Sequence, residues 1–545
     1  MRFPTITSAY FQHRDEAFVI GLVVIPLAFE ALRRTAGWPL VFILAAFFVY
    51  ALWGDSVPGV LQARSPGFYR LVAYLTGDSV ALLGVVLNII VTVVVMFVIM
   101  GQLLATSGGS AWFTDLAMSM FGKRRGGPAK IAVAASALFG SISGSAVANV
   151  ASTGVVTIPL MRRAGYSAAS AGAFEAVAST GGQIMPPVMG AAGFLMAEFL
   201  QISYAEVILA ALVPSLLYYF AVFIQADLEA ARRGLKALAD DEVAPLGQVL
   251  RRGWLFVLPF ALLLVALFSF NRTASEAALW ATASLLVVGL RGYKGHRLTP
   301  RKLIEDMHAA GRTAAPIIVV GAMAGMIIGI VEVTGLGFGL TYVLVSVGEK
   351  SLLLLLLLTA VVAIILGMGM PTTAIYFLLA VLAAPPLVKL GVEPLAAHLF
   401  ILYFGLLSMI TPPVALAAFT AAGLSGARPM ETAVMSVRYG WPAFALPFVF
   451  VLTPGLILAG SLPDIARTVS FTFLGVWFAT VGIGGYFRGE MARAPRFALI
   501  TGGLLLVFPN AYFGVRWLDV VGAAIAAAGL LLCRRTRPRV APTRQ

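Results

Sequence analysis

Charged side chains are scarce in this sequence: Asp, Glu, Lys and Arg make up 11% of its 545 residues. Soluble domains carry about 25% charged residues, so the composition excludes an ordinary soluble protein. Cysteine occurs once, as Cys533, which excludes an internal disulfide framework and a cysteine metal cluster. Only four histidines are present, and the Gly-x-x-x-x-Gly-Lys-Ser/Thr loop of nucleotide-driven pumps is absent. We therefore expect neither an enzyme nor an ATP-driven pump, and no cofactor.

What the sequence has in abundance is apolar residues, 60% of the chain. They form recurring runs near the ~20 residues that a helix needs to cross a bilayer. Backbone polar groups in lipid must be satisfied within the segment, so these runs are predicted to be helices. The sequence predicts an all-α polytopic membrane protein, with simple spans near residues 17–33, 38–53, 80–105, 205–225, 254–271, 274–290, 313–333, 441–460, 467–487, 496–511 and 515–533.

The net charge of +14 is concentrated in short loops between these runs. Examples are Arg33-Arg34, Lys123 to Arg125, Arg162-Arg163, Arg251-Arg252 and the tail from Arg534. This is the positive-inside pattern, which marks such loops as cytoplasmic. We therefore expect a multi-pass protein of the bacterial or archaeal inner (cytoplasmic) membrane whose basic residues face the bilayer surface and not a nucleic acid.

Two segments do not behave as simple spans. Residues 131–160 are apolar but too short to cross twice, since two crossings need about 40 residues. Basic clusters flank them on both sides, so a re-entrant hairpin is predicted, with its turn at Gly140-Ser-Ile-Ser-Gly-Ser145. Residues 167–202 are interrupted by Ser179-Thr-Gly-Gly-Gln-Ile-Met-Pro-Pro187, which predicts one span broken into two half-helices.

The same architecture recurs 226 positions later in the chain. Residues 131–160 correspond to a second hairpin at 357–386, and the first broken span corresponds to a second one at 393–428. Seven identities share this register, most of them at residues that set backbone shape: Pro159/Pro385, Gly165/Gly391, Ile184/Ile410, Pro186/Pro412, Pro187/Pro413, Val188/Val414 and Ala191/Ala417. The sequence therefore predicts an internal repeat.

When the predicted membrane crossings are counted, the first repeat begins outside and the second begins inside, so the two repeats are predicted to be inverted. Six basic residues flank the first hairpin, whereas the second has Lys350 and Lys389, each near a glutamate (Glu349 and Glu393). The first hairpin is thus predicted to open to the cytoplasm and the second to the outside. Inverted repeats with broken helices are the construction of secondary transporters, whose sites lie at the midplane between the repeats.

Small polar groups lie at the predicted hairpin turns and breaks. Helix N-termini there favour an anion, and hydroxyl and carbonyl oxygens suit Na⁺. The substrate-binding candidates are Ser145, Asn149, Gln183, Thr373 and Ser408. Three acids, Glu175, Glu198 and Glu332, lie in or near spans, where ionisable residues are often functional. Glu175 is a candidate proton site, and a solvated edge is the alternative for the other two.

The sequence resembles the membrane permeases of tripartite ATP-independent periplasmic (TRAP) transporters, over about residues 17–533. The motifs that carry the resemblance are Gly126-Gly-Pro-Ala-Lys130, Ala137-Leu-Phe-Gly-Ser-Ile-Ser-Gly-Ser-Ala-Val-Ala-Asn149, Glu175-Ala-Val-Ala-Ser-Thr-Gly-Gly-Gln-Ile-Met-Pro-Pro-Val-Met-Gly190, Gly367-Met-Gly-Met-Pro-Thr-Thr373 and Met409-Ile-Thr-Pro-Pro413. The resemblance is closest to fused small-plus-large permeases that pair with binding proteins of the TAXI type.

The resemblance implies an elevator-type importer of small organic acids, driven by Na⁺ or H⁺ and supplied by a periplasmic binding protein. It places ion sites at the hairpin turns and breaks. Carried over to this sequence, the first ion set is Ser141, Ser143, Gly144, Gly181, Gly182 and Met185, and the second is Gly367, Gly369, Thr372, Met409 and Thr411. Dicarboxylates, 2-oxoacids and glutamate-like amino acids all suit such a site. The alternative function is a divalent-anion/Na⁺ symporter of related architecture that acts without a binding protein.

The expected organisation has five parts. They are shortened small-subunit-like scaffold helices (1–79), the first repeat (80–228), connecting scaffold helices (229–305), the second repeat (306–452), and C-terminal helices with a basic tail (453–545). Fused members of the family usually carry a four-helix small-subunit region, whereas about two helices precede residue 80 here. Three explanations are open: an upstream piece is encoded separately, the true start of the chain is earlier, or this branch uses a shorter scaffold. A separate small membrane subunit is therefore a candidate partner.

Overall fold

A computed structural model describes residues 13–535, which are predominantly helical. Residues 1–12 and 536–545, including most of the predicted basic tail, lie outside the described part. Within residues 13–535, six helices are long and apolar enough to cross a membrane, or seven if the bent pair α23 (Pro429–Tyr439) and α24 (Trp441–Leu452) is one span. The prediction of an all-α polytopic membrane protein is confirmed.

The chain forms two compact units, each assembled from separate stretches of sequence. The first unit comprises residues up to 108 together with 190–205 and 255–406. The second comprises 109–189, 206–254 and the chain from 407 onward. Both predicted broken spans pass from one unit to the other at their breaks, near residues 189 and 407.

The first unit holds the N-terminal helices, the long α16 and the predicted second hairpin. Its helices are α2 (Arg14–Ala36), α3 (Trp38–Trp53), α4 (Phe68–Gly77), α5 (Val85–Ile89), α6 (Val95–Thr106), α11 (Gly190–Leu200), α14 (Leu258–Phe268), α15 (Ala274–Arg291), α16 (Pro300–Thr334), α17 (Leu336–Gly348), α18 (Leu352–Gly367), α19 (Thr372–Leu382), α20 (Ala384–Lys389) and α21 (Pro394–Leu407). A π-helical turn, Ile90–Val94, joins α5 to α6. Asp306 of α16 accepts hydrogen bonds from Thr106 (2.7 Å) and Gln102 (3.2 Å) of α6, which ties these two helices together.

The second unit holds the predicted first hairpin and the C-terminal helices. Its helices are α7 (Gly109–Phe121), α8 (Gly127–Ser143), α9 (Ala146–Arg163), α10 (Ala168–Gly181), α12 (Tyr204–Arg233, from residue 206), α13 (Leu246–Gly253), α22 (Leu416–Ser425), α23 (Pro429–Tyr439), α24 (Trp441–Leu452), α25 (Leu462–Gly484), α26 (Arg493–Val507) and α27 (Trp517–Arg535). A short 3₁₀ turn, η5 (Gly182–Ile184), follows α10.

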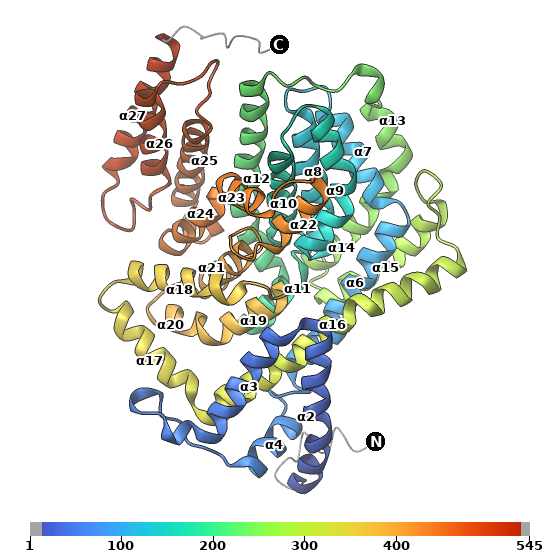
Figure 1. Ribbon diagram of the computed structural model, residues 1–545, viewed down its shortest axis with the longest axis vertical. Coiled ribbons are helices and arrows are strands. Elements are labelled where there is room, and N and C mark those ends of the chain that lie inside the picture. The colour runs from blue at the N-terminus through green and yellow to red at the C-terminus, as the bar shows by residue number, and fades with distance from the viewer. Residues whose placement is uncertain (1–12, 536–545) are drawn as a thin grey trace. The chain divides into compact units, whose positions relative to one another are not determined.

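The last three helices run side by side (Figure 1). They pack through small residues. A Cβ added to Gly502 of α26 would lie 2.6 Å from the carbonyl oxygen of Gly522 in α27. A Cβ added to Gly475 of α25 would lie 2.6 Å from the carbonyl oxygen of Gly503 in α26. Small residues allow such close helix approach, which is the usual way that helices associate in membranes.

Every predicted simple span overlaps a helix, but several limits differ. The span expected at 80–105 begins as a helix only at Val85, because residues 78–84 form turns. The span expected at 441–460 ends at Leu452, before a 3₁₀ turn at Pro454–Ile457. The short helices α4, α7, α17 and α23 were not predicted as separate elements, because each is shorter than a full span.

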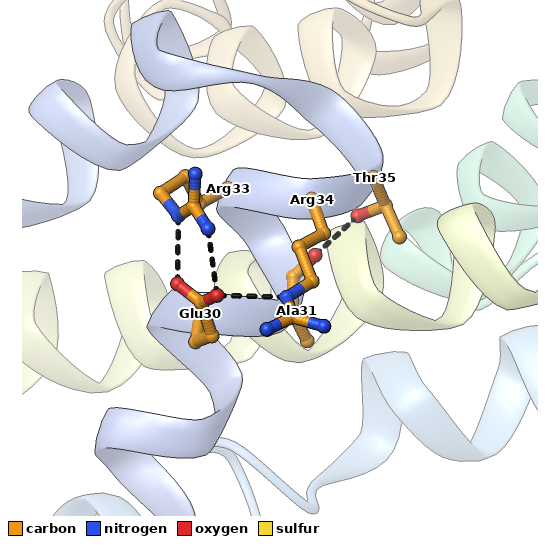
Figure 2. Close-up of polar contacts among 5 residues, drawn as sticks. All are labelled: Glu30, Ala31, Arg33, Arg34 and Thr35. Atoms are coloured by element: carbon orange, nitrogen blue, oxygen red, sulfur yellow. Dashed lines mark hydrogen bonds and ion pairs between the residues drawn. The ribbon is translucent and has the colours of Figure 1, made fainter.

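The basic pair at the end of α2 is partly neutralised by an acid on the same helix. Figure 2 shows both arginines reaching Glu30: Arg33 donates to its two carboxylate oxygens at 2.7 Å each, and Arg34 donates at 2.7 Å. Exposed pairs of this kind add little stability. The Arg33-Arg34 cluster therefore carries a net charge of about +1 with Glu30 included, which is still a basic helix end.

Corresponding residues of the two repeats, 226 positions apart, share unusual backbone conformations. Gly165 and Gly391 have φ angles of 100° and 87°. Met189 and Ala415, which are not glycines, have φ angles of 58° and 25°. The peptide bonds Pro186-Pro187 and Pro412-Pro413 are both cis. Local backbone geometry at the two breaks is thus alike.

Candidate ion and substrate site

Helices α8 and α9 form an antiparallel hairpin, called hairpin 1 below. Helix α8 ends at Ser143, where Gly144 adopts the left-handed conformation (φ 62°) that commonly terminates helices. Helix α9 then begins with Ser145 as its N-cap, whose side chain accepts from the backbone N–H of Ala148 at 3.3 Å. The turn of hairpin 1 lies within the predicted segment 140–145.

Polar side chains hold the two arms of hairpin 1 together. The Asn149 amide donates to the carbonyl oxygen of Ser136 at 2.9 Å, and the hydroxyls of Ser136 and Thr153 lie 3.0 Å apart. Asn149 is fully buried. It therefore has a structural hydrogen bond inside hairpin 1, and its proposed contact with substrate stays a prediction.

The first broken span is interrupted at residues 182–189, called break 1 below. Helix α10 continues through Ser179 and Thr180 to Gly181, slightly further than predicted, and the 3₁₀ turn η5 then leads to Pro186 and Pro187. Tyrosine hydroxyls from α12 bond to the end of α10: Tyr218 donates to the carbonyl oxygen of Val177 at 2.7 Å and Tyr219 to that of Ala178 at 2.8 Å. These bonds satisfy carbonyls near the terminus where helical partners run out.

Hairpin 1 and break 1 lie against each other within the second unit. The backbone N–H of Met189 donates to the carbonyl oxygen of Ser141 at 3.1 Å. A Cβ added to Gly182 would lie 2.5 Å from the Cα of Gly140, so the two backbones are in contact there. The structure therefore brings together the two segments that carry the first predicted ion set, Ser141, Ser143 and Gly144 on the hairpin and Gly181, Gly182 and Met185 on the break.

The turn of hairpin 1 combines opposite helix ends. The C-terminal end of α8 presents carbonyl oxygens and the negative end of its dipole, whereas the N-terminal end of α9 presents N–H groups and the positive end. The hydroxyl oxygen of Ser143 is buried there and has no hydrogen-bond partner among the described residues. A buried hydroxyl without a partner is costly, so this oxygen has the chemistry of a cation ligand.

The second predicted ion set is divided between the two units. In the first unit, Gly367 ends α18 and Thr372 begins α19, and between them Gly369 has a φ angle of 79°. Thr373 follows in the first turn of α19 and is half-buried. In the second unit, the carbonyl oxygen of Met409 accepts from the backbone N–H of Ala417 at 3.0 Å.

The remaining residues of the second break lie within the second unit. Ser408 and Met409 are buried, and the Thr411 hydroxyl donates to the carbonyl oxygen of Leu407 at 2.7 Å. Gln183, the substrate candidate of break 1, is buried within η5. The assignment of Gln183, Thr373 and Ser408 to substrate stays a prediction.

Glu175 lies in the middle of α10, completely buried, in a cage of hydroxyl groups. Ser136 of α8 donates to its Oε1 at 2.9 Å, Thr153 of α9 at 2.5 Å and Ser179 of α10 at 3.2 Å. Thr157 of α9 donates to its Oε2. Among residues 13–535, no group of three or more His, Cys, Asp or Glu side chains could hold a metal ion.

Sequence reasoning singled out Glu175 but missed its partners. The available signal was a polar stripe on an otherwise apolar helix, since Asn149, Thr153 and Thr157 recur every four residues and so share one face of α9. The other two acids differ from Glu175: Glu198 lies in the last turn of α11, where its carbonyl oxygen accepts from the Gln201 side chain, and Glu332 lies in the last turn of α16.

Comparison with known proteins decides the family. The sequence-family model that matches this chain is described as "Tripartite ATP-independent periplasmic transporter, DctM component", and the match spans residues 23–465. The chain belongs to this TRAP transporter family. Membership in this family confirms two predictions: the protein is a transporter and not an enzyme, and it is a multi-pass protein of the inner membrane. Permeases of this family work with a periplasmic substrate-binding protein.

Three relatives illustrate the range of this TRAP family. The chain is 25% identical to the C4-dicarboxylate TRAP transporter large permease protein DctM of Pseudomonas aeruginosa, over 68% of this chain and 83% of that protein. It is 25% identical to the sialic acid TRAP transporter permease protein SiaT of Haemophilus influenzae, over 68% of this chain and 58% of that protein. It is 24% identical to the 2,3-diketo-L-gulonate TRAP transporter large permease protein YiaN of Escherichia coli, over 67% of this chain and 85% of that protein.

The TRAP permease match includes both hairpins and both breaks, whereas α26 and α27 follow its end at residue 465. All sixteen predicted ion- and substrate-binding residues therefore lie within the part of the chain that the family shares.

Proposed function

We propose that this TRAP permease imports a small organic acid, such as a dicarboxylate, a 2-oxoacid or a glutamate-like amino acid. A Na⁺ or H⁺ gradient drives the uptake, and a periplasmic binding protein of the TAXI type delivers the substrate. A separate small membrane subunit is a further partner. Hairpins and broken helices move together as an elevator between inward- and outward-facing positions.

The observation that carries this proposal is the contact between hairpin 1 and break 1. The carboxyl end of α8 and the orphaned Ser143 hydroxyl supply oxygen ligands and negative potential for a cation. The N-terminal end of α9, one residue beyond Gly144, supplies positive potential for a carboxylate. A cation and an organic anion therefore find complementary helix ends within one turn of each other.

Two further observations support the substrate class and the repeat. The relatives' names specify C4-dicarboxylate, sialic acid and 2,3-diketo-L-gulonate, all of which are organic acids. The shared positive φ angles at Gly165/Gly391 and Met189/Ala415 support a common ancestor for the two breaks, which an elevator with two related half-sites requires.

Uptake by purified permease in proteoliposomes tests the proposal. The probes are radiolabelled succinate, 2-oxoglutarate and glutamate, each with and without a TAXI-type binding protein and with an imposed Na⁺ gradient, pH gradient or neither. We expect uptake of at least one acid that requires both the binding protein and a gradient. Uptake that survives collapse of both gradients would overturn secondary transport, and uptake that needs no binding protein would favour the divalent-anion/Na⁺ symporter.

A further inference from the structure

The buried acids among residues 13–535 differ in their partners. Glu229 pairs with Arg233 at 2.6 Å, and Asp519 pairs with Arg467. Asp306 has no cation partner among these residues and accepts from Thr106 and Gln102. Glu175 is fully buried but has no cation partner among residues 13–535; its polar partners are the four hydroxyls of Ser136, Thr153, Thr157 and Ser179. A buried carboxylate without a cation is costly, so an acid kept in this position needs a reason beyond packing.

The elements packed against α10 bring no charge to Glu175. Helix α22 contains no Asp, Glu, His, Lys or Arg. On α8, α9 and α23, which also contact α10, the titratable side chains bond elsewhere or are exposed: Lys130 bonds to Asp227, Arg162 to the Tyr166 carbonyl, Glu431 to Arg428, Arg438 to the Ile483 carbonyl and Tyr439 to Ser170, and Arg163 is exposed. The two α12 tyrosines that reach α10 bond to its backbone, Tyr218 to the Val177 carbonyl and Tyr219 to the Ala178 carbonyl. The charge of the Glu175 carboxyl is therefore set by its own proton and by hydroxyl dipoles.

The hydroxyl cage can accommodate both charge states of the carboxyl. Each threonine hydroxyl has one proton to donate and two lone pairs to accept with. Thr153 Oγ1 lies 2.8 Å from the carbonyl oxygen of Asn149 as well as 2.5 Å from Glu175 Oε1. Thr157 Oγ1 similarly lies 3.0 Å from the carbonyl oxygen of Thr153 and also contacts Glu175 Oε2. Each hydroxyl proton therefore has two alternative acceptors.

These alternatives define two proton arrangements with the same heavy-atom positions. When Glu175 is ionised, the threonine protons point to the carboxylate. When Glu175 carries a proton, it donates that proton to the Thr157 oxygen, and the threonine protons turn to the backbone carbonyls of α9. A single proton is taken from water or released to water, and only an O–H bond forms or breaks.

We propose that Glu175 is a proton-binding site whose loading and unloading are coupled to movement of hairpin 1 against α10. The inference rests on the proposed function and identifies H⁺ as a coupling ion. Three of the four hydroxyls, Ser136, Thr153 and Thr157, belong to hairpin 1, whereas the carboxyl belongs to α10. Hydrogen bonds to a charged acceptor are about twice as strong as neutral ones, so protonation loosens the hairpin from α10.

Infrared difference spectroscopy of the full-length protein in liposomes tests proton binding without any substrate. Spectra are recorded in acidic and in alkaline buffer and subtracted from each other. The proteins compared are the wild type, Glu175→Gln and Asp306→Asn, a control variant of a second buried acid. We expect a carboxylic-acid C=O band that disappears on alkalinisation, is absent from Glu175→Gln and is retained in Asp306→Asn. Two results would overturn the proposal. In the first, Glu175→Gln removes no C=O band from the wild-type spectrum. In the second, the band that Glu175→Gln removes is present at every pH, which would mark Glu175 as a permanently neutral structural acid.

A second variant keeps the test decisive if Glu175→Gln does not fold. Ser136→Ala removes one hydroxyl from the cage and keeps the carboxyl, so the C=O band should remain but shift in frequency. A band that Ser136→Ala leaves unshifted belongs to another acid and contradicts the assignment.

A transport measurement separates this inference from the proposed function. Whichever acid the wild type accumulates, uptake driven by an inward H⁺ gradient should fall at least about tenfold in Glu175→Gln, while exchange of internal for external labelled acid at equal pH continues. If the wild type takes up none of the acids, the proposed function fails; if it does and Glu175→Gln responds to the H⁺ gradient as the wild type does, only the role of Glu175 fails.

Discussion

Gly140 of α8 and Gly182 of η5 lie in backbone contact, with no room for a side chain on either residue. A Cβ on Gly182 would lie 2.5 Å from the Cα of Gly140, and a Cβ on Gly140 would lie 2.8 Å from the Cα of Gly182. Real Cβ atoms do not approach backbone so closely, so a substitution must push hairpin 1 away from break 1. The predicted ion site lies at this contact.

Gly182→Ala is expected to destabilise the permease by about 1–3 kcal/mol and to reduce uptake, because overpacking displaces the backbone at the site. The thermal unfolding midpoint in detergent and the uptake rate measure both effects. Gly247→Ala in α13 is the matched control, since nothing lies within 4 Å of a Cβ there. Equal midpoints for Gly182→Ala and the wild type would show that the contact between Gly140 and Gly182 is not as close as described.

Ser143→Ala is expected to weaken ion coupling without affecting folding, because the Ser143 hydroxyl has no hydrogen-bond partner to lose among the described residues. Loss of one oxygen ligand should raise the half-maximal coupling-ion concentration for uptake by about tenfold, the equivalent of about 1.4 kcal/mol. Thr372→Ala at the second hairpin should act in the same direction. The exposed Ser346→Ala in α17 is the control. Unchanged ion dependence in both Ser143→Ala and Thr372→Ala would count against the two ion sets.

Cysteine labelling tests the predicted inverted topology. In a Cys533→Ser background, Ser145→Cys and Thr372→Cys are expected to react with a membrane-impermeant maleimide from opposite faces, since the two hairpins are predicted to open to opposite sides. Labelling of right-side-out and inside-out vesicles measures this. Lys236→Cys, in an exposed loop predicted to be cytoplasmic, provides the reference side. Labelling of both hairpin cysteines from one side would refute inversion of the repeats.

Tyr218→Phe removes a hydroxyl that donates to the Val177 carbonyl near the end of α10. We expect a loss of about 1 kcal/mol in stability, the usual net value of one buried hydrogen bond. The thermal midpoint should fall, whereas the exposed Tyr342→Phe in α17 should leave it unchanged. A midpoint that Tyr218→Phe does not lower would indicate that the end of α10 does not depend on α12.

Several features of this protein were predictable from local sequence because their causes are local. Apolar runs near 20 residues predict helical spans wherever lipid is the solvent. Pro186-Pro187 and Pro412-Pro413 predict breaks, since proline removes a backbone donor. The break nevertheless begins at Gly182 rather than Ser179, because Ser179 and Thr180 are compatible with a helix and bond within it or to Glu175.

By itself, the amino-acid sequence determined the fold class, the family and the places where helices must end, because hydrophobicity and the backbone limits of proline and glycine act within a few residues. Only the tertiary structure decided that Gly140 contacts Gly182 and that Ser136, Thr153 and Thr157 surround Glu175. These partners lie 18 to 42 positions apart in the chain. Which helical faces meet depends on the packing of whole helices, and no short stretch of sequence contains that information.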